Sequence, residues 1–363
     1  MVREMSVTEL VARIGTDDEP RVVDVREPDE FAAWSIPGAV NIPLSELAAR
    51  MSTLPPDREP VAVCASANRS TRAAEALSRS RRQVANLAGG MAAWGIAYDS
   101  VLIDLGEVQV VQVRRRGKGC LSYLVGAGDS AFAVDPSSDI EVYSQLAQEH
   151  GWRITRVFDT HLHADHLSGA RLLAIASGAS LHLNPADDFN FDYEPLSDGD
   201  RFELPGGAAM NVAALATPGH TSRSTVYVAA DRALLSGDTL FVESVGRPDL
   251  ADRAKEFAHN LYRSLHDKVL GLPDGTLVLP AHCGDTVTVR PDSPIGATLG
   301  DLRRSLAPLG YDEETFVAWA TERAAPRPPN YEAIIKANMG RSTASLAALR
   351  QLELGPNRCA VSA

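Results

Sequence analysis

The sequence has little of what marks secreted, membrane or nucleic-acid-binding proteins. Its four cysteines, at positions 64, 120, 283 and 359, are too widely spaced for a disulfide framework or a CxxC pair. The start has no signal-peptide pattern, and no apolar run is long enough to span a membrane. The formal net charge of −12 argues against nucleic acid as a partner. We therefore expect a cytoplasmic protein that keeps its thiols reduced.

A length of 363 residues indicates two or three domains. Residues 1–98 alternate strand and helix patterns, which predicts an α/β domain with a parallel sheet. Strands dominate from residue 101 on, and the chain reads as mostly helical after residue 295. The helices expected there are residues 295–306, 313–322, 331–338 and 343–353. The domains expected are 1–98, 99–290 and a helical extension 291–363 packed on the second domain, and the basic run 114–118 is expected to be a solvated hairpin end.

Cys64 is the first residue after a predicted buried strand, in the loop 64–69 that leads into a helix. Such a loop presents backbone N–H groups as an anion cradle, and the helix N-terminus and Arg69 both favour a thiolate. An inert cysteine at a strand end is the alternative, and the loop chemistry alone leaves the two about equal.

Several separate motifs resemble a single-domain rhodanese over nearly all of residues 6–96. These motifs are residues 24–31, 36–39, 41–44, 64–69 and 87–94. The resemblance implies that Cys64 carries sulfane sulfur as a persulfide, with Arg69 in the same catalytic loop. The glycine usual in that loop is replaced by Ala67 here, which changes the shape of the cradle.

The strongest signal in the chain is the stretch from Thr160 to His166, placed between a predicted strand and helix. It carries His161, His163, Asp165 and His166, a set of N and O ligands suited to a borderline metal ion. Helix capping is the alternative, but it gives no reason to crowd three imidazoles together. Three further candidate ligands follow predicted strands, namely His220, Asp238 and His282. This order resembles the metallo-β-lactamase fold, whose αββα layers would bring the strand ends together.

Seven ligands are compatible with either one or two metal ions. In a binuclear site, His161, His163 and His220 would hold one ion, Asp165, His166 and His282 the other, and Asp238 would bridge. In a mononuclear site, His161, His220 and Asp238 form the facial triad that suits Fe(II), and the other four orient ligands and water.

The segments 159–169, 236–241 and 246–250 resemble the persulfide dioxygenases, also called sulfur dioxygenases, over roughly residues 121–282. The resemblance implies one Fe(II) per chain on the triad. It also implies oxidation of a low-molecular-weight persulfide by O₂ to sulfite and thiol. Arg247 and Asp249 are the candidate substrate-binding residues, with Arg247 pairing with a carboxylate of the thiol carrier. Residues 285–294 depart from the family pattern near the glutathione site, so glutathione persulfide and another thiol persulfide both remain candidates.

The fusion suggests that Cys64 and the iron site act in series on one sulfur pathway, with thiosulfate or sulfite as further substrates. A binuclear thioester hydrolase of the glyoxalase II type, carrying a separate sulfur-carrier domain, is the nearest rival. A sulfur-carrier or redox-sensing module with an idle metal domain is a rival of another class, and the intact ligand set argues against it. A homo-oligomer is compatible with the sequence.

Overall fold

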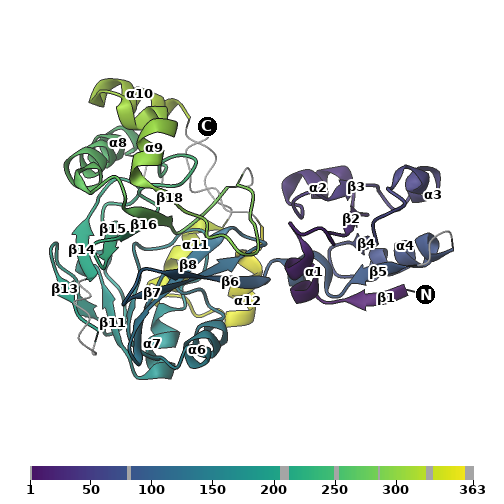
Figure 1. Cartoon of the computed structure of the whole chain (residues 1–363), viewed down its shortest axis with the longest axis horizontal. Coiled ribbons are helices and arrows are strands. Elements are labelled where there is room, and N and C mark those ends of the chain that lie inside the picture. Colours follow the sequence, from purple (N-terminus) through teal and green to yellow (C-terminus); the bar gives the residue numbers. More distant parts are fainter. Residues whose placement is uncertain are drawn as a thin grey trace.

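The structure, a computed structural model, describes residues 2–79, 83–204, 212–248, 253–284, 287–323 and 330–355. Asp249 and Cys359 lie outside the described residues. The chain forms a small N-terminal body and a larger body that holds two sheets (Figure 1). Among the described residues, no helix combines the length and the apolar character needed to cross a membrane.

The N-terminal body is an open parallel sheet with the strand order β1-β5-β4-β2-β3. Its strands are β1 (Val2–Met5), β2 (Arg21–Asp24), β3 (Val40–Asn41), β4 (Pro60–Val63) and β5 (Val84–Leu87). Its helices are α1 (Val7–Arg13), α2 (Pro28–Ala33), α3 (Leu47–Arg50), α4 (Asn68–Ser78) and α5 (Gly90–Trp94). The predicted parallel α/β domain is confirmed. Strands β1 and β3 and helix α2 were not predicted, because short elements at a sheet edge leave little periodicity.

The larger body has a mixed seven-stranded sheet in the order β12-β11-β10-β9-β8-β7-β6. Its strands are β6 (Tyr98–Asp104), β7 (Gln109–Arg115), β8 (Cys120–Ala127), β9 (Ser130–Val134), β10 (Arg153–Phe158), β11 (Ser180–Leu183) and β12 (Glu194–Pro195). A six-stranded sheet has the order β13-β14-β15-β16-β17-β18. It consists of β13 (Arg201–Phe202), β14 (Val212–Ala216), β15 (Thr225–Ala229), β16 (Ala233–Gly237), β17 (Leu277–Pro280) and β18 (Ala297–Thr298).

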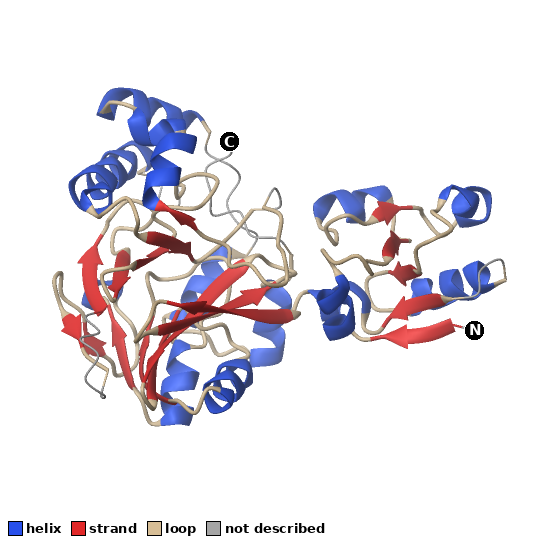
Figure 2. Cartoon of the chain, in the orientation of Figure 1, coloured by secondary structure: helices blue, strands red, loops and turns tan. Residues whose placement is uncertain are grey.

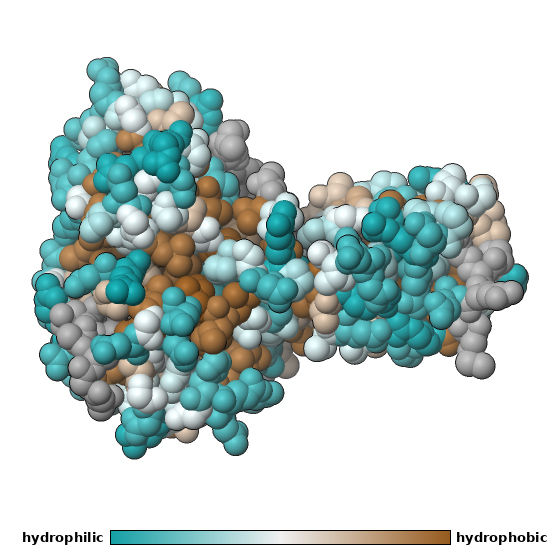
Figure 3. All heavy atoms as spheres, viewed as in Figure 1, coloured by the Kyte–Doolittle hydropathy of each residue, from teal (hydrophilic) through white to brown (hydrophobic). Residues whose placement is uncertain are grey.

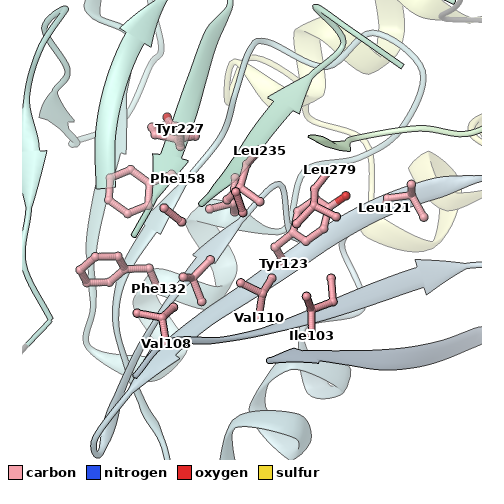
Figure 4. Close-up of a cluster of buried hydrophobic side chains, with 14 of the residues drawn as sticks. Ile103, Val108, Val110, Leu121, Tyr123, Phe132, Phe158, Tyr227, Leu235 and Leu279 are labelled. Carbon is pink, nitrogen blue, oxygen red and sulfur yellow. The ribbon is translucent and has the colours of Figure 1, made fainter. Parts of the chain in front are cut away.

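The two sheets pack face to face through alternating apolar side chains. Phe132, Phe158 and Tyr123 from the first sheet contact Tyr227 and Leu235 from the second in one buried cluster (Figure 4). Because successive side chains of a strand point to opposite faces, each sheet also has an outer apolar face that needs a cover. Helices supply that cover, and the αββα metallo-β-lactamase fold is confirmed (Figure 2).

Helices α6 (Ile140–Glu149) and α7 (Ala170–Ser177) pack on the first sheet. Helices α8 (Ala254–Arg263), α9 (Leu299–Ser305) and α10 (Glu313–Glu322) pack on the second. Helices α11 (Tyr331–Asn338) and α12 (Leu346–Leu352) complete the helical C-terminal part. The predicted helix 295–306 begins later than expected, because β18 pairs with β17 before α9 starts.

The basic run 114–118 is not a solvated hairpin end, and that prediction is wrong. Arg114, Arg115 and Lys118 are buried, with exposed fractions of 1%, 2% and 6%. Asp99 accepts two hydrogen bonds from Arg114, and Glu353 pairs with Arg115. Burial of such cations is tolerated only when they are paired and hydrogen-bonded, and partners distant in sequence supply that pairing here. On the face seen in Figure 3, residues of high hydropathy gather in the middle of the larger body.

Candidate metal centre

Each predicted ligand lies directly after a strand of the sandwich. The loop that follows β10 carries His161, His163, Asp165 and His166; His220 follows β14, Asp238 follows β16, and His282 follows β17. All seven side chains are buried. Strands β16 and β17 run parallel, so their carboxyl ends bring Asp238 and His282 to the same edge of the sheet. The structure therefore places the predicted ligands close together.

His161, His220 and Asp238 form one compact group. The Oδ2 atom of Asp238 lies 3.3 Å from His220 Nε2 and 3.7 Å from His161 Nε2. This oxygen is buried and has no hydrogen-bond partner. Ligands of one ion at bonds of about 2.1 Å lie about 3 Å apart when they are neighbours, so this spacing fits a shared metal. The three residues therefore fit the facial triad that the sequence predicts for iron.

The Nδ1 atoms of His161 and His220 are hydrogen-bonded, which leaves the Nε2 atoms to bind a metal. His220 donates from Nδ1 to the carbonyl oxygen of Arg247 at 3.0 Å, which leaves Nε2 with a free lone pair. The Oγ1 atom of Thr160 lies 2.9 Å from His161 Nδ1 and also 2.9 Å from Asp135 Oδ2. Since the carboxylate accepts the hydroxyl proton, Thr160 accepts from His161 Nδ1, and Nε2 of His161 is free as well.

His163 is held by carboxylates behind the triad. Its Nε2 lies 3.1 Å from Asp135 Oδ1 and 3.7 Å from Asp159 Oδ1. Its Nδ1 is buried and has no hydrogen-bond partner. Asp135 thus accepts a hydrogen bond from Nε2–H, and Nδ1 is the ring atom that faces a metal or its water. Asp135 and Asp159 were not predicted as site residues, although each is the last residue of a predicted strand.

A second group joins Asp165, His166 and His282 to a residue that was not predicted, Cys120. One ligand atom from each of these four buried residues lies within 4.8 Å of the others. The backbone of Cys120 forms an isolated antiparallel β-bridge with that of His282, in which Leu121 N donates to Ala281 O at 2.7 Å. This pairing holds Cys120 in place. This pairing joins distant strands, so no local pattern could have predicted it.

The pKa shifts favour the ligating form for some residues and oppose it for others: burial works against the charged imidazole, but neighbouring acidic groups outweigh burial and raise the pKa of His163 and His166. Burial lowers the pKa of His161 well below its usual value, so its imidazole is neutral. Burial works against the charged form of Asp238, but His282 and His220 outweigh it and hold the pKa of that carboxyl below its usual range. Burial also disfavours the thiolate of Cys120, yet the neighbouring His166 and His282 lower its pKa to about 6. Cys283 behaves differently, since burial raises its pKa to about 12.

The loop around Gly246 and Arg247 supports the triad. A Cβ on Gly246 would overlap the carbonyl oxygen of Asp238, so only glycine allows this close approach. Arg247 is fully buried, and its backbone carbonyl orients His220. A direct contact between the Arg247 side chain and substrate stays a prediction, and the same prediction for Asp249 falls on a residue outside the described part of the chain.

The loop after β4 builds the predicted cradle around Cys64, which is 1% exposed. The backbone N–H of Ser70 donates to Cys64 Sγ at 3.3 Å. Burial opposes the thiolate, but hydrogen bonds from Ser70, Ser66 and Arg69 outweigh it and lower the pKa of Cys64. The cradle thus supports a nucleophilic thiol.

The guanidinium of Arg69 is occupied by another partner. It donates two hydrogen bonds of 2.7 Å to the carboxylate of Glu30 on α2. Ala67 has the left-handed φ of 70°, the backbone conformation in which a glycine is expected. A catalytic role of the Arg69 side chain stays a prediction.

Two family models match the chain and agree with this geometry. The rhodanese-like domain matches residues 6–97, and the metallo-beta-lactamase superfamily matches residues 115–282. A metallo-beta-lactamase from Staphylococcus aureus is a similar solved structure, with a TM-score of 0.59 and 25% identity. That match covers 66% of this chain and 74% of the other. The chain is therefore a rhodanese-like domain fused to a metallo-β-lactamase domain.

Relatives identify the family within that class. The mitochondrial persulfide dioxygenase ETHE1 of Bos taurus is 30% identical over 228 residues, or 61% of this chain and 84% of the relative. The human ETHE1 is 30% identical over 223 residues, or 60% of this chain and 82% of the relative. The crystal structure of ETHE1 from Myxococcus xanthus has a TM-score of 0.56 and 28% identity, covering 63% of this chain and 96% of that one. The chain belongs to the ETHE1 persulfide dioxygenase family.

Proposed function

We propose that the chain oxidises a low-molecular-weight thiol persulfide with O₂ at one Fe(II) ion held by His161, His220 and Asp238. The balanced reaction consumes one persulfide, one O₂ and one water, and it releases thiol, sulfite and two protons. The observation that carries this proposal is the convergence of two Nε2 atoms on the unpartnered Oδ2 of Asp238. Bound there, Fe(II) would supply the redox chemistry that brings O₂ and a soft sulfur anion together.

Neighbouring residues orient the candidate ligands and set which ring nitrogen of each histidine carries a proton. Thr160 and the Arg247 carbonyl hold the ring orientation of His161 and His220. The Nδ1–H of His282 donates to Asp238 Oδ1 at 2.7 Å, which leaves Oδ2 directed at the imidazoles. We further propose that Arg247 and Asp249 contact the thiol carrier.

We propose in addition that Cys64 accepts or delivers sulfane sulfur for the same pathway. A Cys64 persulfide attacked by sulfite would release thiosulfate and regenerate the thiol, without any further oxidant. The two domains touch directly, since Trp34 Nε1 donates to Gly117 O at 2.8 Å and Arg115 Nε donates to Gly95 O at 2.7 Å. These contacts support a fixed arrangement in which one domain uses the product of the other.

The test is metal content and oxygen uptake on one anaerobically purified sample, with glutathione persulfide as substrate. About one iron per chain and uptake that Asp238→Ala abolishes would support the proposal. The Cys64→Ser variant should keep oxygen uptake and lose thiosulfate formation. Unchanged thiosulfate formation in that variant would contradict the coupling.

The cluster of Asp165, His166 and His282 favours one second candidate, a binuclear thioester hydrolase. In such a site Asp238 would be the bridging carboxylate, and its Oδ1 already lies beside His282 of this cluster. Two metal ions per chain, no oxygen uptake and cleavage of S-lactoylglutathione would favour that reading over the dioxygenase.

A further inference from the structure

Two side chains from the C-terminal helices hold the backbone of the metal loop, here residues 159–169. Asn338, the last residue of α11, donates from Nδ2 to the carbonyl oxygens of His163 and His166, both at 2.9 Å. Its Oδ1 accepts from the backbone N–H of Ser168 at 3.0 Å. One amide thus makes three hydrogen bonds within the loop.

Glu353, which follows α12, makes the fourth contact. Its Oε2 accepts from the backbone N–H of Leu167 at 2.7 Å, and its Oε1 accepts from Arg115 Nη1 at 3.0 Å. Glu353 is 2% exposed, and Lys118 Nζ donates to its backbone carbonyl at 2.8 Å. Both carboxylate oxygens are therefore engaged, one on the loop and one on a cation.

These contacts replace the backbone pairing that a strand or helix would provide. The loop is irregular between β10 and α7, and buried backbone N–H and C=O groups need partners. Side chains of the loop have other partners: His163 lies beside Asp135, and Asp165 lies beside His282. The positions of the candidate ligands on this loop thus depend in part on a backbone that Asn338 and Glu353 hold.

We propose that Asn338 and Glu353 are positioning residues that set the geometry and the affinity of the metal centre. This inference rests on the proposed metal-dependent function, but it concerns residues of the C-terminal part, outside the matched residues 115–282. Arg115, which pairs with Glu353, also donates to Gly95 O of the N-terminal domain. Glu353 is therefore connected to the metal loop directly and to that domain through Arg115.

The test uses the variants Asn338→Leu and Glu353→Gln. The control is Glu332→Gln, which makes the same change of charge as Glu353→Gln but on an exposed residue of α11. Co(II) is titrated anaerobically into each apo variant against a chelator, and the visible spectrum of the bound ion is recorded. We expect Asn338→Leu to weaken Co(II) binding by at least about tenfold and to change the spectrum, as loss of groups that orient metal ligands does. Glu353→Gln should have a smaller effect in the same direction, because a Gln carbonyl can still accept from Leu167, and Glu332→Gln should have none.

Thermal unfolding of the apo variants separates positioning from general stability. A lower Tm with parental Co(II) affinity and spectrum in Asn338→Leu would overturn the proposal. The Asp238→Ala variant tests whether Co(II) binding by the parent protein requires Asp238, as the proposed site demands. If the parent binds one metal through Asp238 but consumes no O₂ with persulfide, the proposed function fails while the positioning role is still tested.

Discussion

Replacing Thr160 with valine removes one hydroxyl and keeps the shape of the side chain. That hydroxyl donates to Asp135 and accepts from His161 Nδ1, and the residue is 2% exposed. The hydroxyl thereby fixes the tautomer in which Nε2 of His161 has its lone pair free. In Thr160→Val, the metal-binding tautomer has a buried Nδ1–H without this acceptor.

The magnitude follows from the cost of that orphaned donor. A buried polar group that loses its partner costs about 1–3 kcal/mol. Without metal, the ring can lower this cost by carrying its proton on Nε2, where it faces the Asp238 carboxylate; the attraction is electrostatic, because the 3.7 Å to Oδ2 is longer than a hydrogen bond. The penalty therefore falls mainly on the bound state, and metal affinity should drop about 10- to 100-fold, since about 1.4 kcal/mol is a factor of ten.

The assay is chelator competition with Co(II) or Fe(II) under anaerobic conditions, on Thr160→Val and on Thr160→Ser. Serine keeps the hydroxyl and loses only a methyl group, so its affinity should stay within a few-fold of the parent. Equal affinity of the valine variant and the parent would refute the argument that Thr160 fixes the His161 tautomer. Equal losses in both variants would show that the loss does not depend on the hydroxyl, because serine keeps it.

Three predictions concern the loop of Cys64. A Cβ at Gly90 would overlap the carbonyl oxygen of Cys64, so Gly90→Ala should destabilise the domain by about 1–3 kcal/mol in denaturant unfolding and abolish sulfur transfer to cyanide. Ala67→Gly should stabilise it by about 1 kcal/mol in the same assay, because glycine accepts the left-handed backbone without strain; no gain would show that the strain is absent. The lowered pKa of Cys64 predicts that iodoacetamide alkylation, followed by mass spectrometry, rises with pH and levels off below the range of an ordinary thiol. Its thiolate then contributes stability at alkaline pH that is lost as the pH falls through the folded pKa. The side-chain hydroxyl of Ser70 lowers the pKa of Cys64 in addition to the backbone N–H, so Ser70→Ala should move the alkylation inflection to higher pH; an unmoved inflection would refute the role of that hydroxyl.

The gathering of the seven candidate ligands could be predicted because each is a polar residue close after the end of an apolar strand, which is a local pattern. Their division into a triad and a second set was one of the alternatives that the sequence left open, but the positions of Asp135 and Cys120 among them depend on side-chain directions that spacing does not give. Cys120 enters the second group only through the pairing of the start of β8 with the end of β17. Such long-range pairing is invisible in the spacing of residues along the chain.

The C-terminal part shows the same limit. Helices Glu313–Glu322 and Tyr331–Asn338 have the predicted bounds, because their apolar periodicity is local, as is the cap that Asp312 gives the first of them. Their roles differ, however, with α10 packing on the outer face of a sheet and Asn338 of α11 reaching the metal loop. A single asparagine at a helix end carries no sign in the sequence of what it contacts.

The buried basic run explains how the three parts of the chain are joined. Arg115 donates to Gly95 O and pairs with Glu353, and Glu353 accepts from Leu167 N of the metal loop. A buried ion pair adds little net stability, because desolvating two charges costs about what their attraction returns. Removing only one partner is costly, since it leaves an unpaired charge in the interior, so the pair specifies one docking arrangement more than it strengthens the fold. Such a pair fixes the distance between Cys64 and the candidate metal centre better than a flexible linker would, and the proposed passage of sulfur between the two sites would profit from a fixed distance.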